Sequence, residues 1–334
     1  MRLLVTGSAG FIGYHLAKHR LEQGDTVIGI DNLNDYYEVS LKRARLEQLQ
    51  TYPSFVFYEG DLCDAHTLQE LFTTHQPTHV VNLAAQAGVR YSLTNPHAYV
   101  QSNVVGFTTL IEACKQFKIE HLVYASTSSV YGANTRQPYQ ESDSTNHPLA
   151  IYAATKKANE LIAHSYSHLY QIPTTGLRFF TVYGPWGRPD MAFFSFTRDI
   201  LAGKPITVYN QGQMQRDFTY IDDIVEGISR VIDSPATSNA MWSSESPDAA
   251  SSRAPYRVLN LGCGHPVHLM DYIEAIEQAT GKKAIKRFLP MQEGDVISTH
   301  ADTTRFDSLY GSYEKTQVQE GIRRFVEWYR GYYI

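Results

Sequence analysis

A threonine, a tyrosine and a lysine have the types and spacing of a proton-transfer site. Thr127 lies in the hydroxyl-rich run Ser126-Thr127-Ser128-Ser129, and Tyr152 and Lys156 follow it by 25 and 29 residues. If the chain from residue 152 onward is helical, Tyr152 and Lys156 share one helix face. An ammonium beside a phenol favours the phenolate and lowers its pKa from the usual value of about 10. The pattern therefore predicts that Tyr152 acts as a base near neutral pH.

The Tyr-x-x-x-Lys spacing alone is a weak signal, because the chain contains 23 tyrosines in 334 residues. The same spacing recurs at Tyr14 and Lys18, which we interpret as an ordinary helix surface. Two features distinguish Tyr152, namely the hydroxyl cluster upstream of it and a glycine-rich segment near the N-terminus.

The glycine-rich segment lies between a predicted buried strand, Leu3-Leu4-Val5, and a predicted helix that begins at Phe11. Glycines in such a loop allow a tight turn and a close approach of phosphate to the backbone. The N-terminus of the helix then offers N–H groups and partial positive charge to a pyrophosphate. The order strand, loop, helix is the one that a dinucleotide site requires. The predicted contacts are Gly7, Gly10, Phe11, Ile12 and Gly13.

An acidic residue ends the next predicted strand, since the run from Thr26 to Ile30 leads into Asp31, 18 residues after Gly13. A carboxylate there can bond both ribose hydroxyls of NAD and would repel the 2′-phosphate of NADP. We therefore expect NAD as the cofactor, with Asn32 beside it. Asp61-Leu62 lies where an adenine contact would fall, and a plain turn is an equal alternative there.

Composition argues against several other classes of function. The net charge of −5 and the lack of a basic run give no footprint for nucleic acid or a membrane surface. No apolar stretch reaches about 18 residues, and the N-terminus enters a core strand at once, so we expect neither a membrane span nor a signal peptide. Three scattered cysteines and 13 histidines show no metal-ligand pattern. We expect a cytoplasmic protein with free thiols and no metal site.

Apolar runs alternate with helical patterns over the first 180 residues, which predicts an α/β fold with a doubly wound, parallel Rossmann sheet. Residues 1–180 are expected to form the NAD-binding domain. A smaller, discontinuous α/β substrate domain is expected over 181–334, with segments near 211–233 and 257–263 returning to the first. The predicted strands are 2–6, 26–30, 54–58, 79–84, 121–126, 173–179 and 257–261. The predicted helices are 11–23, 40–50, 64–74, 99–117, 152–170, 192–203, 221–233 and 318–329. A polar loop is expected around Gly212 and Asp217, and a long exposed loop over 234–256.

Together these features resemble the extended short-chain dehydrogenase/reductase family, and specifically its nucleotide-sugar 4-epimerases. The resemblance covers nearly the whole chain. Besides the glycine loop, the hydroxyl cluster and Tyr152/Lys156, it rests on Asn82-Leu83-Ala84-Ala85, Asn103, Arg178 to Pro185, Arg216-Asp217-Phe218 and Gly294-Asp295. Within that group the chain is most similar to UDP-glucuronate 4-epimerases, through Asp31 to Tyr37, Gln86 to Arg90 and Pro185 to Asp190.

The resemblance implies a transient oxidation of a UDP-sugar at C4. Tyr152 would take the proton from the sugar O4 while the C4 hydride moves to NAD⁺. Lys156 would bond the nicotinamide ribose, and Thr127 would bridge O4 and the phenol. The 4-keto sugar would then turn over in the site and take the hydride back on its other face, so NAD would stay bound between turnovers. Helices 99–117 and 152–170 would pair in a homodimer, as in relatives.

The resemblance also implies further binding residues. Arg216 would contact the diphosphate and Asp295 the uridine ribose. Many relatives carry a phosphate-binding arginine where this chain has Met291-Gln292-Glu293. Arg216 would therefore have to provide more of the positive charge that binds the diphosphate. The other implied contacts are Ala84 and Asn103 for the cofactor, and Arg90, Ser128, Ser129, Thr181 and Arg188 for the substrate.

Two positions discriminate among the chemistries of this scaffold. Ser129 stands where dehydratases and decarboxylases carry an acid, which favours simple epimerisation. Arg188 can grip a sugar carboxylate bidentately, although it can also be a plain surface cation. The alternatives are a 4-epimerase for UDP-glucose or UDP-N-acetylglucosamine, and a non-catalytic NAD-binding scaffold. The intact set of Thr127, Tyr152 and Lys156 argues against the scaffold.

Overall fold

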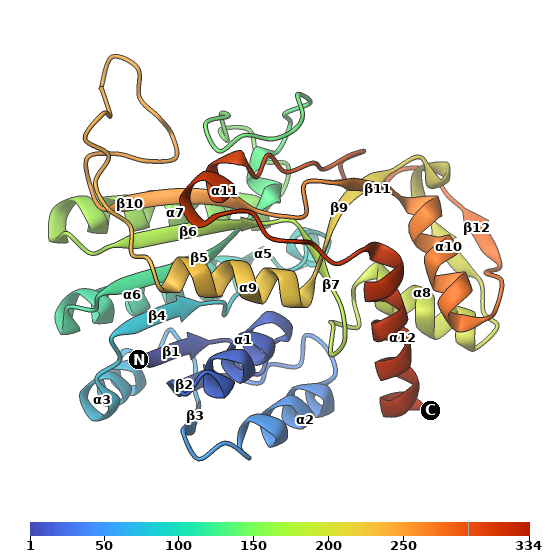
Figure 1. The fold of residues 1–334 in the computed structure, drawn as a ribbon, viewed down its shortest axis with the longest axis horizontal. Coiled ribbons are helices and arrows are strands. Elements are labelled where there is room, and N and C mark those ends of the chain that lie inside the picture. The colour runs from blue at the N-terminus through green and yellow to red at the C-terminus, as the bar shows by residue number, and fades with distance from the viewer. Residues whose placement is uncertain (293) are drawn as a thin grey trace.

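The structure is a computed structural model that describes residues 1–292 and 294–334. Its described residues form a parallel seven-stranded sheet in the order β10-β6-β5-β4-β1-β2-β3 (Figure 1). The strand order reverses between β1 and β4, as in a doubly wound Rossmann sheet. This confirms the predicted fold class. The strands are β1 (Arg2–Thr6), β2 (Thr26–Asp31), β3 (Phe55–Glu59), β4 (His79–Asn82), β5 (His121–Thr127), β6 (Thr174–Phe179) and β10 (Tyr256–Leu261).

Helices cover both faces of this sheet because successive strand residues point to opposite sides. Leu3 and Val5 of β1 join the core on one face, while Leu4 joins the core on the other. The first face is covered by α1 (Phe11–Glu22), α2 (Val39–Leu49) and α9 (Ile221–Ile232). The second is covered by α3 (Ala65–His75), α6 (Gly106–Phe117) and α7 (Ile151–Tyr170).

The second half of the chain forms smaller sheets with helices beside them. Strands β7 (Thr181–Tyr183), β9 (Gln215–Tyr220) and β11 (Pro266–His268) make one sheet, and β8 (Ile206–Val208) pairs with β12 (Lys286–Phe288). Besides α9, the helices of this half are α8 (Ala192–Leu201), α10 (Leu269–Thr280), α11 (Thr304–Tyr310) and α12 (Val318–Tyr333). Short helical segments in the first half are α4 (Tyr91–Thr94), α5 (Pro96–Tyr99), η1 (Val100–Val105) and η2 (Ser128–Tyr131), and η3 (Tyr209–Gly212) follows β8.

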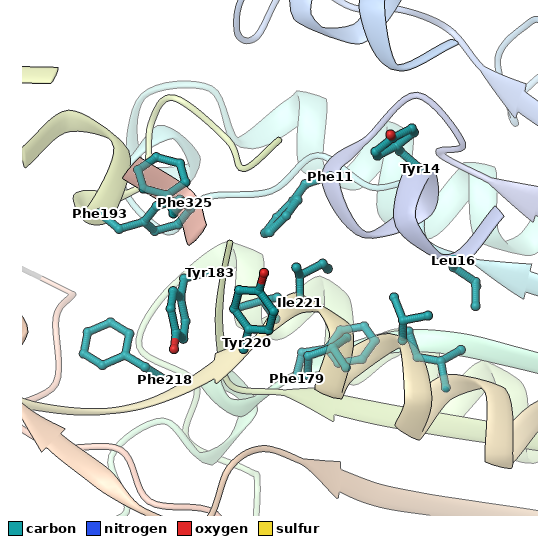
Figure 2. Packing of buried hydrophobic residues seen from close by; sticks show 14 of the residues in the cluster. Phe11, Tyr14, Leu16, Phe179, Tyr183, Phe193, Phe218, Tyr220, Ile221 and Phe325 are labelled. Atoms are coloured by element: carbon teal, nitrogen blue, oxygen red, sulfur yellow. The ribbon is translucent and has the colours of Figure 1, made fainter. Parts of the chain in front are cut away.

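One hydrophobic core joins the two halves. It includes Phe11 at the start of α1, Ile221 at the start of α9 and Phe325 on α12 (Figure 2). The rings of Phe193 and Phe325 lie edge to face with centroids 4.8 Å apart, and Phe11 lies 6.5 Å from Phe193. This shared core fixes the second half relative to the sheet.

Two sequence-based interpretations are wrong. Asp217 does not lie in a polar loop. It is in strand β9, where its buried carboxylate accepts backbone hydrogen bonds from Cys263, Gly264 and Ala301 at 2.8, 3.0 and 3.0 Å. Tyr14 is not on a helix surface, because only 1% of it is exposed and its hydroxyl donates to Gln48 Oε1 at 2.7 Å.

The predicted helix over 99–117 is divided. It begins as α5, passes through the π-helical turn η1 and continues as α6. Helices α10 and α11 were not expected from the sequence. The segment between α9 and β10 extends away from the sheet on the side opposite α8 and α12 (Figure 1). Among the described residues, no helix has the length and apolarity to cross a membrane, and no cluster of three or more His, Cys, Asp or Glu side chains is suited to a metal ion.

Candidate active site

A cavity of about 1100 Å³ opens at the carboxyl ends of β1, β2, β4 and β5 and reaches into the second half of the chain. This is the edge at which open α/β sheets bind ligands. Nearly all of the predicted site residues line it. They are Gly7, Gly10, Phe11, Ile12, Gly13, Asp31, Asn32, Asp61, Leu62, Ala84, Arg90, Thr127, Ser128, Ser129, Tyr152, Lys156, Thr181, Arg188, Arg216 and Asp295.

The glycine loop between β1 and α1 packs tightly because Gly7 and Gly13 lack side chains. Gly7 has φ +69°, and a Cβ there would lie 2.8 Å from the backbone N of Ala84. A Cβ on Gly13 would lie 2.1 Å from Gly7 O, so the helix start could not approach the loop so closely. The backbone is thus shaped as a cradle in which the N-terminus of α1 faces the cavity, which fits the pyrophosphate of a dinucleotide.

Asp31 ends β2 and lies 9% exposed at the cavity wall. Its Oδ2 accepts a hydrogen bond from Ala9 N at 3.1 Å, and its Oδ1 accepts one from Leu33 N at 2.9 Å. Each oxygen keeps a further lone pair, so the carboxylate can still accept from ribose hydroxyls. Asn32 donates to Asp61 Oδ2 at 2.8 Å, so these two predicted residues lie together.

The three candidate catalytic side chains converge on the cavity from two elements. Thr127 ends β5, while Tyr152 and Lys156 lie on the first two turns of α7. Thr127 Oγ1 accepts from the backbone N of Ser129 at 3.2 Å, which leaves its own O–H to be donated toward the cavity. The Tyr152 ring lies edge to face against Tyr99, with centroids 6.0 Å apart.

Burial dominates the electrostatics of this trio. It raises the pKa of Tyr152 more than the Thr127 hydroxyl and the Arg188 charge lower it. It also lowers the pKa of Lys156 to about 8. The predicted depression of the Tyr152 pKa by Lys156 is therefore not a property of the protein by itself.

Asn103 differs from the other predicted residues. Among the residues that the structure describes, it is not one of those that line the cavity. It is buried, and its Oδ1 accepts from Gln86 N at 2.8 Å. Its Nδ2 donates to Gln86 O and to Thr155 Oγ1, each at 3.1 Å. Asn103 therefore links the loop after β4 to α7 and supports the position of the trio without facing the cavity.

Arg188 lies on the cavity wall but already has a carboxylate partner. Its Nε lies 3.0 Å from Asp190 Oδ1, its Nη2 donates to Oδ2, and Tyr36 donates to the same Oδ2 at 3.2 Å. Asp190 and Tyr36 were not predicted as site residues. The only sequence signal for them was their place in the two segments that carry the resemblance.

Three further predicted substrate residues, Arg90, Arg216 and Asp295, also line the cavity. Arg90 and Asp295 form an ion pair at 3.4 Å, and Arg90 lies over the ring of Tyr209 at 5.1 Å. Arg216 donates to the carbonyls of Gln215 and Ile297 at 2.8 and 3.0 Å. Of the stretch Met291-Gln292-Glu293, Glu293 lies outside the described residues.

Comparison with known proteins agrees with this geometry. Residues 3–242 match the NAD dependent epimerase/dehydratase family. The chain is 49% identical to a probable UDP-glucuronate 4-epimerase of Rhizobium meliloti (strain 1021), over 98% of this chain and 97% of that one. It is 48% identical to UDP-glucuronate 4-epimerase 1 of Arabidopsis thaliana, over 99% of this chain and 77% of that one.

A solved structure of UDP-glucuronic acid 4-epimerase from Bacillus cereus, in complex with UDP-glucuronic acid and NAD, superposes with a TM-score of 0.86. It is 32% identical in sequence, and the match covers 100% of both chains. With its glycine cradle, its acid at the end of β2 and its Thr127, Tyr152 and Lys156 on one cavity, this chain belongs to the NAD dependent epimerase/dehydratase family.

Proposed function

We propose that this chain interconverts UDP-glucuronate and UDP-galacturonate by NAD-dependent epimerisation at C4 of the sugar. The observation that carries the proposal is that Thr127, Tyr152 and Lys156 share one cavity with the glycine cradle and Asp31. The sugar is taken from the relatives, of which the Bacillus cereus enzyme binds UDP-glucuronic acid and NAD.

When bound, NAD supplies the hydride acceptor and, in its oxidised form, a positive charge. The protein's own part is to move one proton and to orient the sugar. Tyr152 accepts the proton of the sugar O4, with the Thr127 hydroxyl bridging the two oxygens, and returns it at the end of the cycle. Lys156 stabilises the phenolate between these steps, since burial makes the phenolate of Tyr152 unfavourable without nearby cations.

A hexuronate substrate adds one demand, because its 4-keto form is a β-keto acid that can lose CO₂. Loss requires the carboxylate to stand nearly perpendicular to the plane of the ketone. Ser128, Ser129, Thr181 and Arg188 line the cavity and are proposed to hold the carboxylate in another orientation. Neither Ser128 nor Ser129 can act as the acid that elimination or decarboxylation chemistry uses on this scaffold.

One observation favours a second candidate, a 4-epimerase for neutral UDP-sugars. The charge of Arg188 is already compensated by Asp190, which weakens its attraction for a sugar carboxylate. This candidate predicts equal use of UDP-glucose and indifference to the charge at position 188.

We further propose that residues 1–180, together with α9 and β10, hold the cofactor, and that the rest of 181–334 holds the UDP-sugar. A homodimer is proposed through the helices around α6 and α7. Their large exposed side chains are Val100, Val105, Leu161, Leu169 and Tyr170, of which Leu169 is 65% exposed. Light scattering of Leu161→Asp/Leu169→Asp against the unmodified chain tests this. The free cysteines suit a reducing compartment, and the cytoplasm is the proposed location.

The function is tested by incubating the purified protein with UDP-glucuronate, without added cofactor, and separating the C4 epimers by chromatography. Formation of UDP-galacturonate supports the proposal. If the protein converts UDP-glucose but not UDP-glucuronate under the same conditions, the proposal is wrong and the neutral-sugar candidate replaces it.

A further inference from the structure

Arg45 is a fully buried arginine on α2 whose guanidinium makes four hydrogen bonds. Its Nη1 donates to Ala9 O and to the hydroxyl of Tyr37, each at 2.8 Å. Its Nη2 donates to Trp186 O at 2.6 Å and to Gly187 O at 3.3 Å. A lysine could not make these four hydrogen bonds, because its ammonium has three donors on one nitrogen, whereas a guanidinium has five donors on three nitrogens.

The partners of Arg45 belong to three separate segments, each of which contains residues that line the cavity. Ala9 is in the glycine loop, and its N–H is held on the other side by Asp31. Tyr37 lies in the loop between β2 and α2 and lines the cavity. Trp186 and Gly187 directly precede Arg188. One charged group outside the cavity lining thus joins the cofactor loop to the loop of the candidate sugar-binding arginine.

A second contact fixes the same loop. His15 on α1 donates from Nε2 to Pro185 O at 2.9 Å, so three consecutive carbonyls, 185 to 187, accept from side chains of α1 and α2. Burial lowers the pKa of His15 to about 3, which keeps the ring neutral. Trp186 has φ +59°, a conformation that non-glycine residues adopt only when their surroundings hold them there.

We propose that Arg45 is a positioning residue that couples the cofactor loop to the Arg188 loop, so that the grip on NAD and the placement of Arg188 depend on each other. The second test below rests on the proposed function, because it measures turnover of UDP-glucuronate. The first test measures only NAD exchange and needs no turnover.

The first test measures retained NAD. Arg45→Met keeps much of the side-chain volume and removes the donors, Arg45→Lys keeps the charge, and Arg43→Met is the matched control at an exposed position of the same helix. Exchange of bound NAD for labelled NAD should be faster by about 5-fold or more in Arg45→Met, in the range of typical site-to-site couplings. Arg45→Lys should recover only part of the difference, and Arg43→Met should match the unmodified protein. Unchanged exchange in Arg45→Met would overturn the proposal.

The second test is a double-mutant cycle on kcat/KM for UDP-glucuronate with Arg45→Met and Arg188→Ala. If Arg45 acts through the Arg188 loop, the double variant should be little worse than Arg188→Ala, because interacting residues are not additive. Additive losses would show that Arg45 and Arg188 affect kcat/KM independently, which overturns the coupling. Failure of the proposed function would appear instead as inactivity of the unmodified protein with this sugar.

If Arg45→Met does not fold, His15→Phe takes its place in both tests, because it removes one hydrogen bond to the same loop. The expected direction is the same, and faster NAD exchange with a normal melting temperature supports the coupling. Unchanged NAD exchange in a folded His15→Phe variant would overturn it.

Discussion

Arg188 and Asp190 form a bidentate ion pair on the cavity wall, with Arg188 Nε 3.0 Å from Asp190 Oδ1. A sugar carboxylate that reaches Arg188 must therefore share the guanidinium with a carboxylate of the same loop. An arginine has five N–H donors, so capacity remains for a second acceptor. The pair also holds Arg188 in a defined orientation before any ligand binds.

Arg188→Ala should reduce kcat/KM for UDP-glucuronate by about 10- to 150-fold, because a hydrogen bond to a charged group is worth about 1.5–3 kcal/mol. Activity on UDP-glucose should change little, so the measured quantity is the ratio of the two kcat/KM values. Arg323→Ala, at an arginine on α12 that is 52% exposed and also ion-paired, is the control. An unchanged ratio would move the carboxylate site elsewhere, with Arg90 as the next candidate.

Tyr152→Phe should lower the epimerisation rate by about 10²- to 10⁴-fold, the usual contribution of a positioned acid–base group. NAD should remain bound, because only the proton-transfer hydroxyl is lost. Tyr170→Phe is the matched control, since this tyrosine lies on the same helix and is 47% exposed. Equal activity of the two variants would refute the role of Tyr152.

Lys156→Met should stabilise the cofactor-free protein while removing activity. Burial lowers the pKa of Lys156 from 10.5 to about 8, so the charged ammonium reduces the free energy of unfolding. This destabilisation is fully present below pH 8. It disappears between pH 8 and about 10.5, because Lys156 loses its proton in the folded chain before it does so in the unfolded chain. The gain at pH 7 should be about 3 kcal/mol at most.

Urea unfolding of the NAD-free protein across this pH range measures the difference, with the exposed Lys204→Met as the control. A Lys156→Met variant that is less stable than the unmodified protein at pH 7 would mean that the ammonium has a compensating partner in the folded state.

NAD, and not NADP, should be released when the purified protein is denatured. Asp31 at the end of β2 can accept from ribose hydroxyls and would repel a 2′-phosphate. Asp31→Asn should shift the preference toward NADP, while Asp35→Asn, at an exposed position four residues later, should not. Mass analysis of the released nucleotide decides, and NADP in the unmodified protein would contradict the assignment.

The strands of the main sheet and its doubly wound class could be predicted from the sequence, because these strands are short apolar runs between clear helical patterns. It failed at β9, whose sequence Gln-Arg-Asp-Phe-Thr-Tyr looks like a loop. Asp217 is tolerated in that strand because backbone N–H groups from residues 263, 264 and 301 satisfy it. Such partners are distant in sequence, so no local pattern could reveal them.

The predicted cavity residues were mostly found together, because the loops that carry them follow parallel strands and meet at one sheet edge. The supporting residues were missed for the opposite reason. Arg45 lies on α2 outside the cavity lining. Lys42, on the same helix, lines the cavity and holds the loop after β2 by donating to Asn34 O at 2.6 Å. Their helix positions resemble those of any surface cation, and only the tertiary structure shows that both are buried.

The most direct measurement follows the hydrogen at C4. The protein is given UDP-glucuronate deuterated at C4, and the products are analysed by NMR. We expect UDP-galacturonate that retains the deuterium at C4, with little UDP-pentose, because the hydride leaves and returns within one site. Exchange of the C4 deuterium with solvent, or a pentose as the main product, would contradict it.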